Sequence, residues 1–130
     1  MTGFKLDPAF RIADEQSLRS LFREQTPLAA LKCQSSLDTH AQAFIRRSPF
    51  ICIGTQNGDG RADVSPRGDP RGFVKILDRH TLAIPDRPGN NRLDSLVNIL
   101  ANPSVGILFI IPGFDDTLRV NGQATLVNEP

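Results

Sequence analysis

The sequence predicts a mainly β fold, a small antiparallel β-barrel with peripheral helices. Two observations support this class. From residue 50 onward, short runs rich in β-branched and aromatic residues alternate with turn segments such as "NGDG" and "DRH", which are typical of hairpins and therefore of antiparallel strands. The helical patterns are too few to cover a sheet made of these strands, whereas closing the sheet into a barrel removes its exposed edges.

The first part of the chain has helical patterns. Residues 13–25 carry apolar residues at helical spacing, with acidic residues at the start and a proline soon after, so we expect a helix there. Residues 26–37 read as either a loop or a short helix. A second helix is expected over residues 38–48, because Asp38 is a good N-cap and a proline follows the segment.

The rest of the chain reads as strands with one inserted helix. Strands are expected over residues 49–56, 61–67, 73–77, 81–85, 105–111 and 117–127. The run 105–111 is continuously apolar, so we expect burial on both of its faces. Gly122 is expected to form a β-bulge in the last strand. The helix, ending near residue 100, is expected to pack through one apolar face: Leu93, Leu96, Val97 and Leu100.

Composition narrows the functional classes. The 130 residues are enough for one core, and the net charge of +1 gives no support for binding nucleic acid or an acidic membrane. No signal peptide and no apolar run long enough to span a membrane is recognisable, so we expect a cytoplasmic protein. Cys33 and Cys52 fit no metal-site spacing and are expected to be reduced thiols, with Cys52 in the core. His40 and His80 are expected to be solvated, and no metal site is predicted.

The segment "IPDRPGNNRLDSL", residues 84–96, concentrates positive charge at the start of the expected helix. A helix N-terminus offers unpaired N–H groups and the positive end of the helix dipole, which together favour an anion. Asn90 or Asn91 can cap the helix, and with Asn91 as the cap a capping box with the following aspartate is expected. Arg87 and Arg92 suit phosphate oxygens. The alternative is exposed arginines paired with neighbouring aspartates, which needs no ligand.

The segment "DVSPRGDPRGF", residues 63–73, is a second polar cluster. Pro66 donates no ladder hydrogen bond, so this strand cannot be an ordinary central strand. Ser65 and Arg67 place a hydroxyl and a guanidinium near the strand end. The alternative is an ordinary polar loop.

Taken in order, the motifs "SPRGD", "GF", "IPDRPGN", "DSL", "NIL", "NP", "LF", "IPG" and "LRVNG" resemble the pyridoxamine 5′-phosphate oxidase-like flavoproteins, in particular a bacterial branch with this pattern. The resemblance covers roughly residues 37–130. It implies an FMN-binding split β-barrel domain over 37–130, short at its C-terminus, after an N-terminal helical extension over 1–36. It also implies a homodimer with FMN in the groove between the subunits.

The resemblance implies a set of cofactor-binding residues. The strand beside the flavin ring contributes Val64, Ser65, Pro66 and Arg67. Backbone groups beside the ring or ribityl chain come from Ile84, Pro85 and Asp86. The phosphate is held by Asn91 and Arg92, with Asn90 and Arg87 as neighbours. Arg119 and Asn121 are implied to lie near the dimer interface.

The sequence departs from the vitamin B6 oxidase, because we find neither its substrate-phosphate pocket nor its C-terminal motif. Oxidation of pyridoxamine phosphate is therefore not expected. The chain also stops early, on a last strand whose open edge calls for a partner subunit or further C-terminal sequence.

We expect an FMN-dependent oxidoreductase acting on an unidentified small molecule, with Arg67 donating to the N1/O2 edge of the ring and with no evident general base. Two alternatives stay open. One is a non-catalytic module that binds or sequesters flavin, and the other is a split-barrel protein that binds deazaflavin F420 or haem.

Overall fold

The computed structural model describes residues 5–22, 35–86 and 93–128. The chain divides into two compact units, Met1–Gln34 and Ser35–Pro130. The division into a helical extension over residues 1–36 and a barrel domain over residues 37–130 stays a prediction. Within the described ranges, no helix has both the length and the apolar character needed to cross a bilayer.

The described part of the N-terminal unit, residues 5–22, includes two short helices. The 3-10 helix η1 spans Pro8–Phe10, and α1 spans Glu15–Arg19. Asp14 caps α1 by accepting a 2.7 Å hydrogen bond from the Ser17 amide. The predicted helix over 13–25 is too long, because α1 ends at Arg19, and residues 23–25 lie outside the described part. The Ser20 hydroxyl donates to the Ser17 carbonyl at 2.7 Å, a local bond that competes with helix propagation.

The second unit begins with α3, Thr39–Arg47, which confirms the helix expected over 38–48. The Asp38 carboxylate accepts from the Ala41 amide at 2.8 Å and caps the helix. Ser48 is already extended, as expected for a residue that precedes proline. Its buried hydroxyl oxygen lies 2.8 Å from the carbonyl oxygens of both Phe50 and Ile110, and donating its one proton to either ties the end of α3 to the strands.

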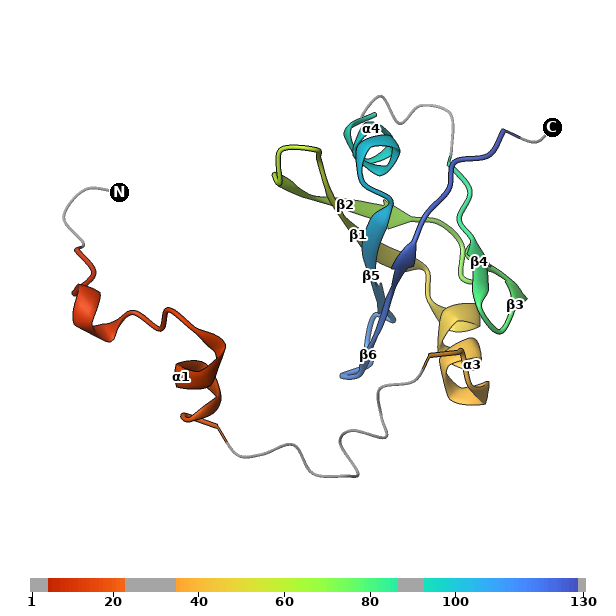
Figure 1. Ribbon diagram of the computed structural model, residues 1–130. Coiled ribbons are helices and arrows are strands. Elements are labelled where there is room, and N and C mark those ends of the chain that lie inside the picture. The colour runs from red at the N-terminus through yellow and green to blue at the C-terminus, as the bar shows by residue number, and fades with distance from the viewer. Residues whose placement is uncertain (1–4, 23–34, 87–92, 129–130) are drawn as a thin grey trace. The chain divides into compact units, whose positions relative to one another are not determined.

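Among the described residues, six strands form two antiparallel sheets, which confirms the mainly β, antiparallel class (Figure 1). The larger sheet has the order β2-β1-β5-β6, and the smaller sheet consists of β3 and β4. The strands are β1 Phe50–Gln56, β2 Ala62–Gly68, β3 Lys75–Asp78, β4 Thr81–Ala83, β5 Ser104–Ile110 and β6 Thr117–Gln123. The "NGDG" hairpin is confirmed: Asn57 donates its amide to the Arg61 carbonyl at 2.9 Å, and Gly60 takes the positive φ of +85°.

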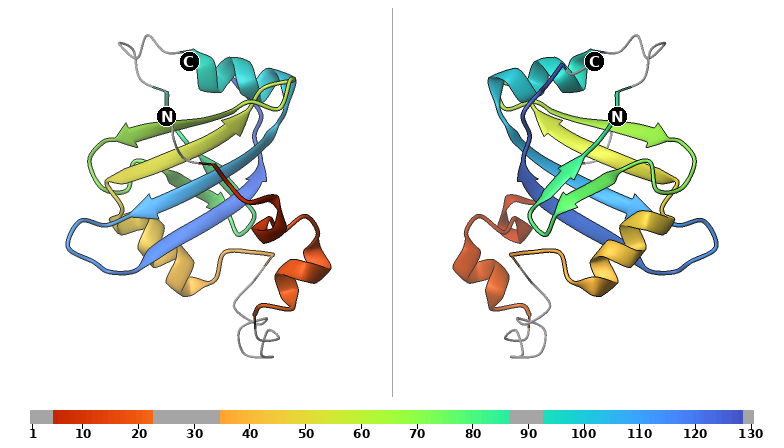
Figure 2. Two further views of the ribbon diagram at one scale, coloured as in Figure 1. Left: turned by 90° about the vertical axis from the view of Figure 1, so that its left-hand side faces the viewer. Right: turned by 90° about the vertical axis from the view of Figure 1, so that its right-hand side faces the viewer.

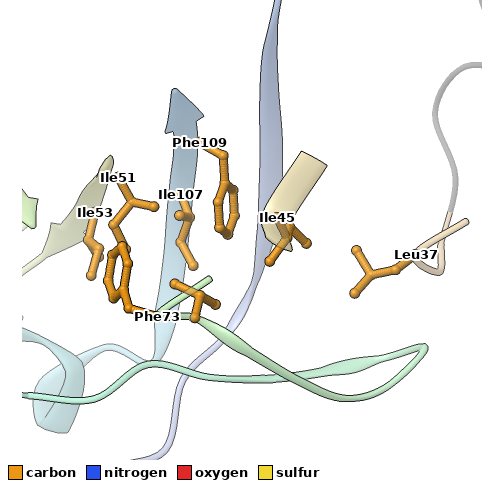
Figure 3. Packing of buried hydrophobic residues seen from close by; sticks show 8 residues of the cluster. Leu37, Ile45, Ile51, Ile53, Phe73, Ile107 and Phe109 are labelled. Carbon is orange, nitrogen blue, oxygen red and sulfur yellow. The ribbon is translucent and has the colours of Figure 1, made fainter. Parts of the chain in front are cut away.

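The core lies between the large sheet and the β3–β4 hairpin, which crosses one face of that sheet in both views of Figure 2. Apolar side chains from β1, β5, α3 and the segment before β3 converge there, as Figure 3 shows. The buried cluster consists of Leu37, Ile45, Ile51, Ile53, Phe73, Val74, Ile107 and Phe109. Ile51 and Phe109 are fully buried and directly opposite each other in the β1–β5 pairing. Their contact joins the two central strands to the core.

Three expectations about the strands are wrong. Burial in β5 alternates, with Ile107 and Phe109 buried but Leu108 and Ile110 only half-buried, so the run 105–111 is not covered on both faces by this chain. Cys52 is half-buried on the side of β1 opposite Ile51 and Ile53, and is therefore not in the core. Gly122 makes no bulge, because β5 and β6 keep a regular register through it.

The helix α4, Asp94–Ala101, also differs from expectation. It begins at Asp94 with Leu93 as N-cap and no side-chain cap bond, so the capping box with Asn91 is wrong. The face predicted to pack on the sheet points mostly outward, with Leu93 58%, Val97 58% and Leu100 74% exposed. The buried residues of the helix are polar instead: Ser95 and Asn98.

Hydrogen-bond partners on the sheet explain this orientation. The Asn98 amide nitrogen donates to the Thr55 hydroxyl at 3.0 Å, and both residues are buried. The Ser95 hydroxyl donates to the Asp63 carboxylate at 3.4 Å. Buried polar groups require partners, so the polar stripe of α4 meets the polar end of β1 and β2.

Candidate functional site

The strand β2 presents different residues on its two faces. It is the first strand in the sheet order and so has no neighbour on one side within the described chain, which agrees with the edge position expected from Pro66. Ser65 and Arg67 pair with Ile53 and Ile51 and therefore point toward the core side of the sheet. Val64 and Pro66 lie on the opposite face, where Val64 is 67% exposed. The four candidates on β2 thus divide into a polar pair and an apolar pair.

The polar pair of β2 meets the second predicted segment. The Arg67 guanidinium forms an ion pair with the Asp86 carboxylate at 2.5 Å and donates from Nε to the Ser65 hydroxyl at 3.4 Å. The Arg67 side chain is 12% exposed and the Asp86 side chain 41% exposed. Residues far apart in the sequence therefore form one partly buried polar site.

Asp86 makes this contact through its side chain, whereas the family resemblance implied a role for its backbone groups, and the alternative paired it with a neighbouring arginine. The sequence did suggest an ion pair, because Asp86 lies in an arginine-rich segment. The arginine nearest to it in the sequence is Arg87, however, and no spacing indicated Arg67 as its partner. Ile84 is half-buried and packs against the core cluster, and Pro85 is exposed. Ile84 therefore anchors the segment to the core two residues before Asp86.

The predicted phosphate-binding residues, Arg87, Asn90, Asn91 and Arg92, lie outside the described residues. Their role stays a prediction. The described chain fixes both ends of their segment, at Asp86 through the Arg67 ion pair and at α4 through Asn98.

The two residues implied for the interface lie on β6. Arg119 and Asn121 are exposed and sit on the sheet face away from the core, opposite Leu108 and Gly106. The Asn121 side-chain oxygen lies 3.1 Å from where a Cβ of Gly106 would be, so it covers this glycine. An alanine at this position would press on that oxygen.

Among residues 5–22, 35–86 and 93–128, no three His, Cys, Asp or Glu side chains come together as potential metal ligands. His40 and His80 are exposed, as expected. Hydrogen bonds from the His80 amide and from Thr81 hold the pKa of the Asp78 carboxyl below its ordinary value, and these bonds serve the β3–β4 turn.

A family model described as pyridoxamine 5′-phosphate oxidase matches residues 37–130. The chain belongs to the pyridoxamine 5′-phosphate oxidase family. Membership confirms the resemblance seen in the motifs and the split-barrel class, and it makes a flavin-type ligand the expectation for this fold. The match begins just before α3 and includes every strand of both sheets.

Other comparisons add little to this family assignment. The sequence has no match among curated proteins. A crystal structure of a variant of HupZ from Group A Streptococcus is similar with a TM-score of 0.45 and 14% identity, over 58% of this chain and 58% of that chain. A similarity of this size assigns no ligand to the chain.

Proposed function

We propose that this member of the pyridoxamine 5′-phosphate oxidase family binds FMN and is an oxidoreductase acting on a small molecule. The observation that carries the proposal is the Arg67–Asp86 ion pair, which joins the two segments that the motifs assign to the flavin ring. A homodimer with the cofactor between subunits, and a location in the cytoplasm, belong to the same proposal.

The polar groups present suit the edge of a flavin ring. That edge carries hydrogen-bond acceptors and one N–H donor. Arg67 and the Ser65 hydroxyl are donors, and Asp86 is an acceptor, all beside the half-buried Ile84. A guanidinium that is only 12% exposed keeps much of its electrostatic effect, because little water screens it.

The bound flavin supplies the redox chemistry, and the chain supplies position and charge. Arg67 would stabilise negative charge on the reduced ring through its N–H donors. Asp86 would hold Arg67 in place, and Ile84 would limit water around the ring edge. Pro85, next to Asp86 in the sequence, would contribute apolar contact area there, whereas Val64 and Pro66 lie on the opposite face of β2 and would not contact these groups.

We propose that the segment between Asp86 and α4 binds the phosphate end of FMN. Arg87, Asn90, Asn91 and Arg92 would hold the phosphate by charge-assisted hydrogen bonds. The Asn98–Thr55 bond keeps α4 on the sheet, so we expect it to position this segment without touching the cofactor.

A spectrum tests the proposal. Purified protein mixed with FMN and freed of excess ligand should absorb near 450 nm, roughly where bound flavins absorb. Arg92→Ala and Arg67→Gln should each weaken FMN binding, whereas Arg61→Gln, an exposed arginine beside the β1–β2 turn, should not. Circular dichroism of each variant checks that the fold is kept. Colourless wild-type protein at saturating FMN would refute the proposal.

Two measurements separate the alternatives. Reduction of the bound flavin by NADH or NADPH, followed by reoxidation by an added acceptor, supports an enzyme, and no turnover with any donor supports a sequestering module. Mass spectrometry of the ligand released on denaturation separates FMN from deazaflavin F420 and haem.

A further inference from the structure

A second cationic site lies where α3, the loop after β2 and β3 meet. A concavity of about 380 Å³ is lined by Arg46, Arg71, Gly72, Val74, Lys75 and Ile76. None of these residues belongs to the segments proposed to hold flavin. Figure 1 shows α3 next to the β3–β4 hairpin, where this concavity lies.

The loop that carries Arg71 is held against the end of α3. The Gly72 amide donates to the Ser48 carbonyl at 3.3 Å, and the Asp69 amide donates to the Pro49 carbonyl at 3.0 Å. Gly72 has a φ of +78°, and a Cβ there would lie 3.1 Å from the Arg46 carbonyl oxygen. A side chain at this position would be strained by the positive φ and would press on that oxygen, so glycine suits this close approach of the loop to α3.

The positive charges of this site have no acidic partner in the described ranges. No ion pair is found there for Arg46, Arg71 or Lys75. Lys75 donates to the Gly72 carbonyl at 2.8 Å, which holds its ammonium at the site and leaves two of its three N–H donors for a ligand. Arg46 has only a 3.5 Å contact with the Gln42 side chain. Arg46, Arg71 and Lys75 are exposed residues that line one concavity, so an anion bound there would meet three cationic side chains.

The floor of the site is apolar. Val74 is 3% exposed and belongs to the core cluster, and Ile76 packs against that cluster. Cations around an apolar floor suit a ligand with an apolar body and an anionic head. Basic residues at the C-terminus of a helix also stabilise its dipole, which accounts for Arg46 but not for Arg71 or Lys75, which lie outside the helix.

We propose that this pocket, formed by Arg46, Arg71 and Lys75 over Val74 and Ile76, binds a small organic anion with a phosphate or carboxylate head. The site is distinct from the flavin site. The inference does not depend on the proposed function, because it rests on residues that the flavin proposal does not use.

The test is a titration of ¹⁵N-labelled full chain at low ionic strength, where charge is least screened. The probes are phenyl phosphate, benzoate and the neutral benzyl alcohol. Saturable shifts of the Gly72 and Lys75 amide signals are expected with phenyl phosphate or benzoate and not with benzyl alcohol. Which anion binds more tightly identifies the head group. No saturable shift with either anion, or equal shifts with the neutral probe, would overturn the inference.

Variants identify the charges responsible. Arg71→Gln and Lys75→Gln should each weaken binding about fivefold or more, because each removes one charged donor. Arg79→Gln removes the same charge from the β3–β4 turn, outside the pocket, and should change binding less than twofold. Equal weakening by all three would show an effect of net charge alone. FMN absorbance should be unchanged in Arg71→Gln, and its loss would make the pocket part of the flavin site and contradict this inference.

Discussion

The Arg67–Asp86 ion pair should stabilise the fold, and replacing Asp86 should cost more stability than replacing Arg67. The Arg67 side chain is 12% exposed and the Asp86 side chain 41% exposed. A hydrogen bond to a charged group contributes about 1.5–3 kcal/mol, and an exposed ion pair contributes about 0–1 kcal/mol. This pair lies between those cases, so we expect a coupling free energy of about 1–2 kcal/mol.

The direction of the inequality follows from solvent access. Asp86→Asn leaves a guanidinium with little access to water and no counter-charge, whereas Arg67→Gln leaves a carboxylate that water can solvate. Asp86→Asn should therefore lower the free energy of unfolding more than Arg67→Gln does. Both single variants and the double variant complete the cycle.

Urea unfolding followed by far-UV circular dichroism measures these changes, since the sequence has no Trp and no Tyr for fluorescence. Glu15→Gln is the control, because the Glu15–Arg19 pair is 73% and 76% exposed and such a pair contributes about 0.3–0.5 kcal/mol. A coupling below about 0.3 kcal/mol, within the error of additivity, would refute the reasoning, as would a larger loss for Arg67→Gln.

Three further predictions concern the frame around the site. Asn98→Ala should lower the free energy of unfolding by about 1–3 kcal/mol, because the Thr55 hydroxyl loses its buried partner, and Thr55→Val in the same chain should recover part of this loss in urea unfolding. Phe109→Ala, at a fully buried position, should cost about 3–5 kcal/mol in the same assay, and a loss under about 1 kcal/mol would contradict the core described above. The folded-state pKa of Asp78 is lowered, so its contribution is present above its unfolded-state pKa and is lost as pH falls through the folded-state value. The protection factor of the His80 amide against hydrogen exchange should fall only as pH drops below the ordinary aspartate pKa of about 3.9, and Asp78→Ala should remove this pH dependence.

Much of the architecture could be predicted because it depends on local chemistry. Asn57 and Gly60 occupy a turn that few other residues allow, so the β1–β2 hairpin was readable directly. Asp38 caps α3 through a bond within one helical turn. Pro66 excluded a central strand because it lacks an N–H group. The family could be recognised from the sequence, because each of its motifs occupies a short stretch and the motifs follow one another in order.

Contacts between segments distant in the sequence could not be predicted in this way. The spacing of Leu93, Val97 and Leu100 shows that they share a face of α4, but not which face meets the sheet. That choice depended on Thr55 and Asp63, whose polar groups needed partners on the helix.

The Arg67–Asp86 pair and the pocket lined by Arg46, Arg71 and Lys75 have the same origin. Each brings together charges from elements that meet only after the sheet and the β3–β4 hairpin have packed. Turns and helix caps can therefore be predicted from short stretches of sequence, because their hydrogen-bond partners lie within a few residues. The placement of charge at both sites depends on which faces the folded elements present to one another, and only tertiary packing decides that.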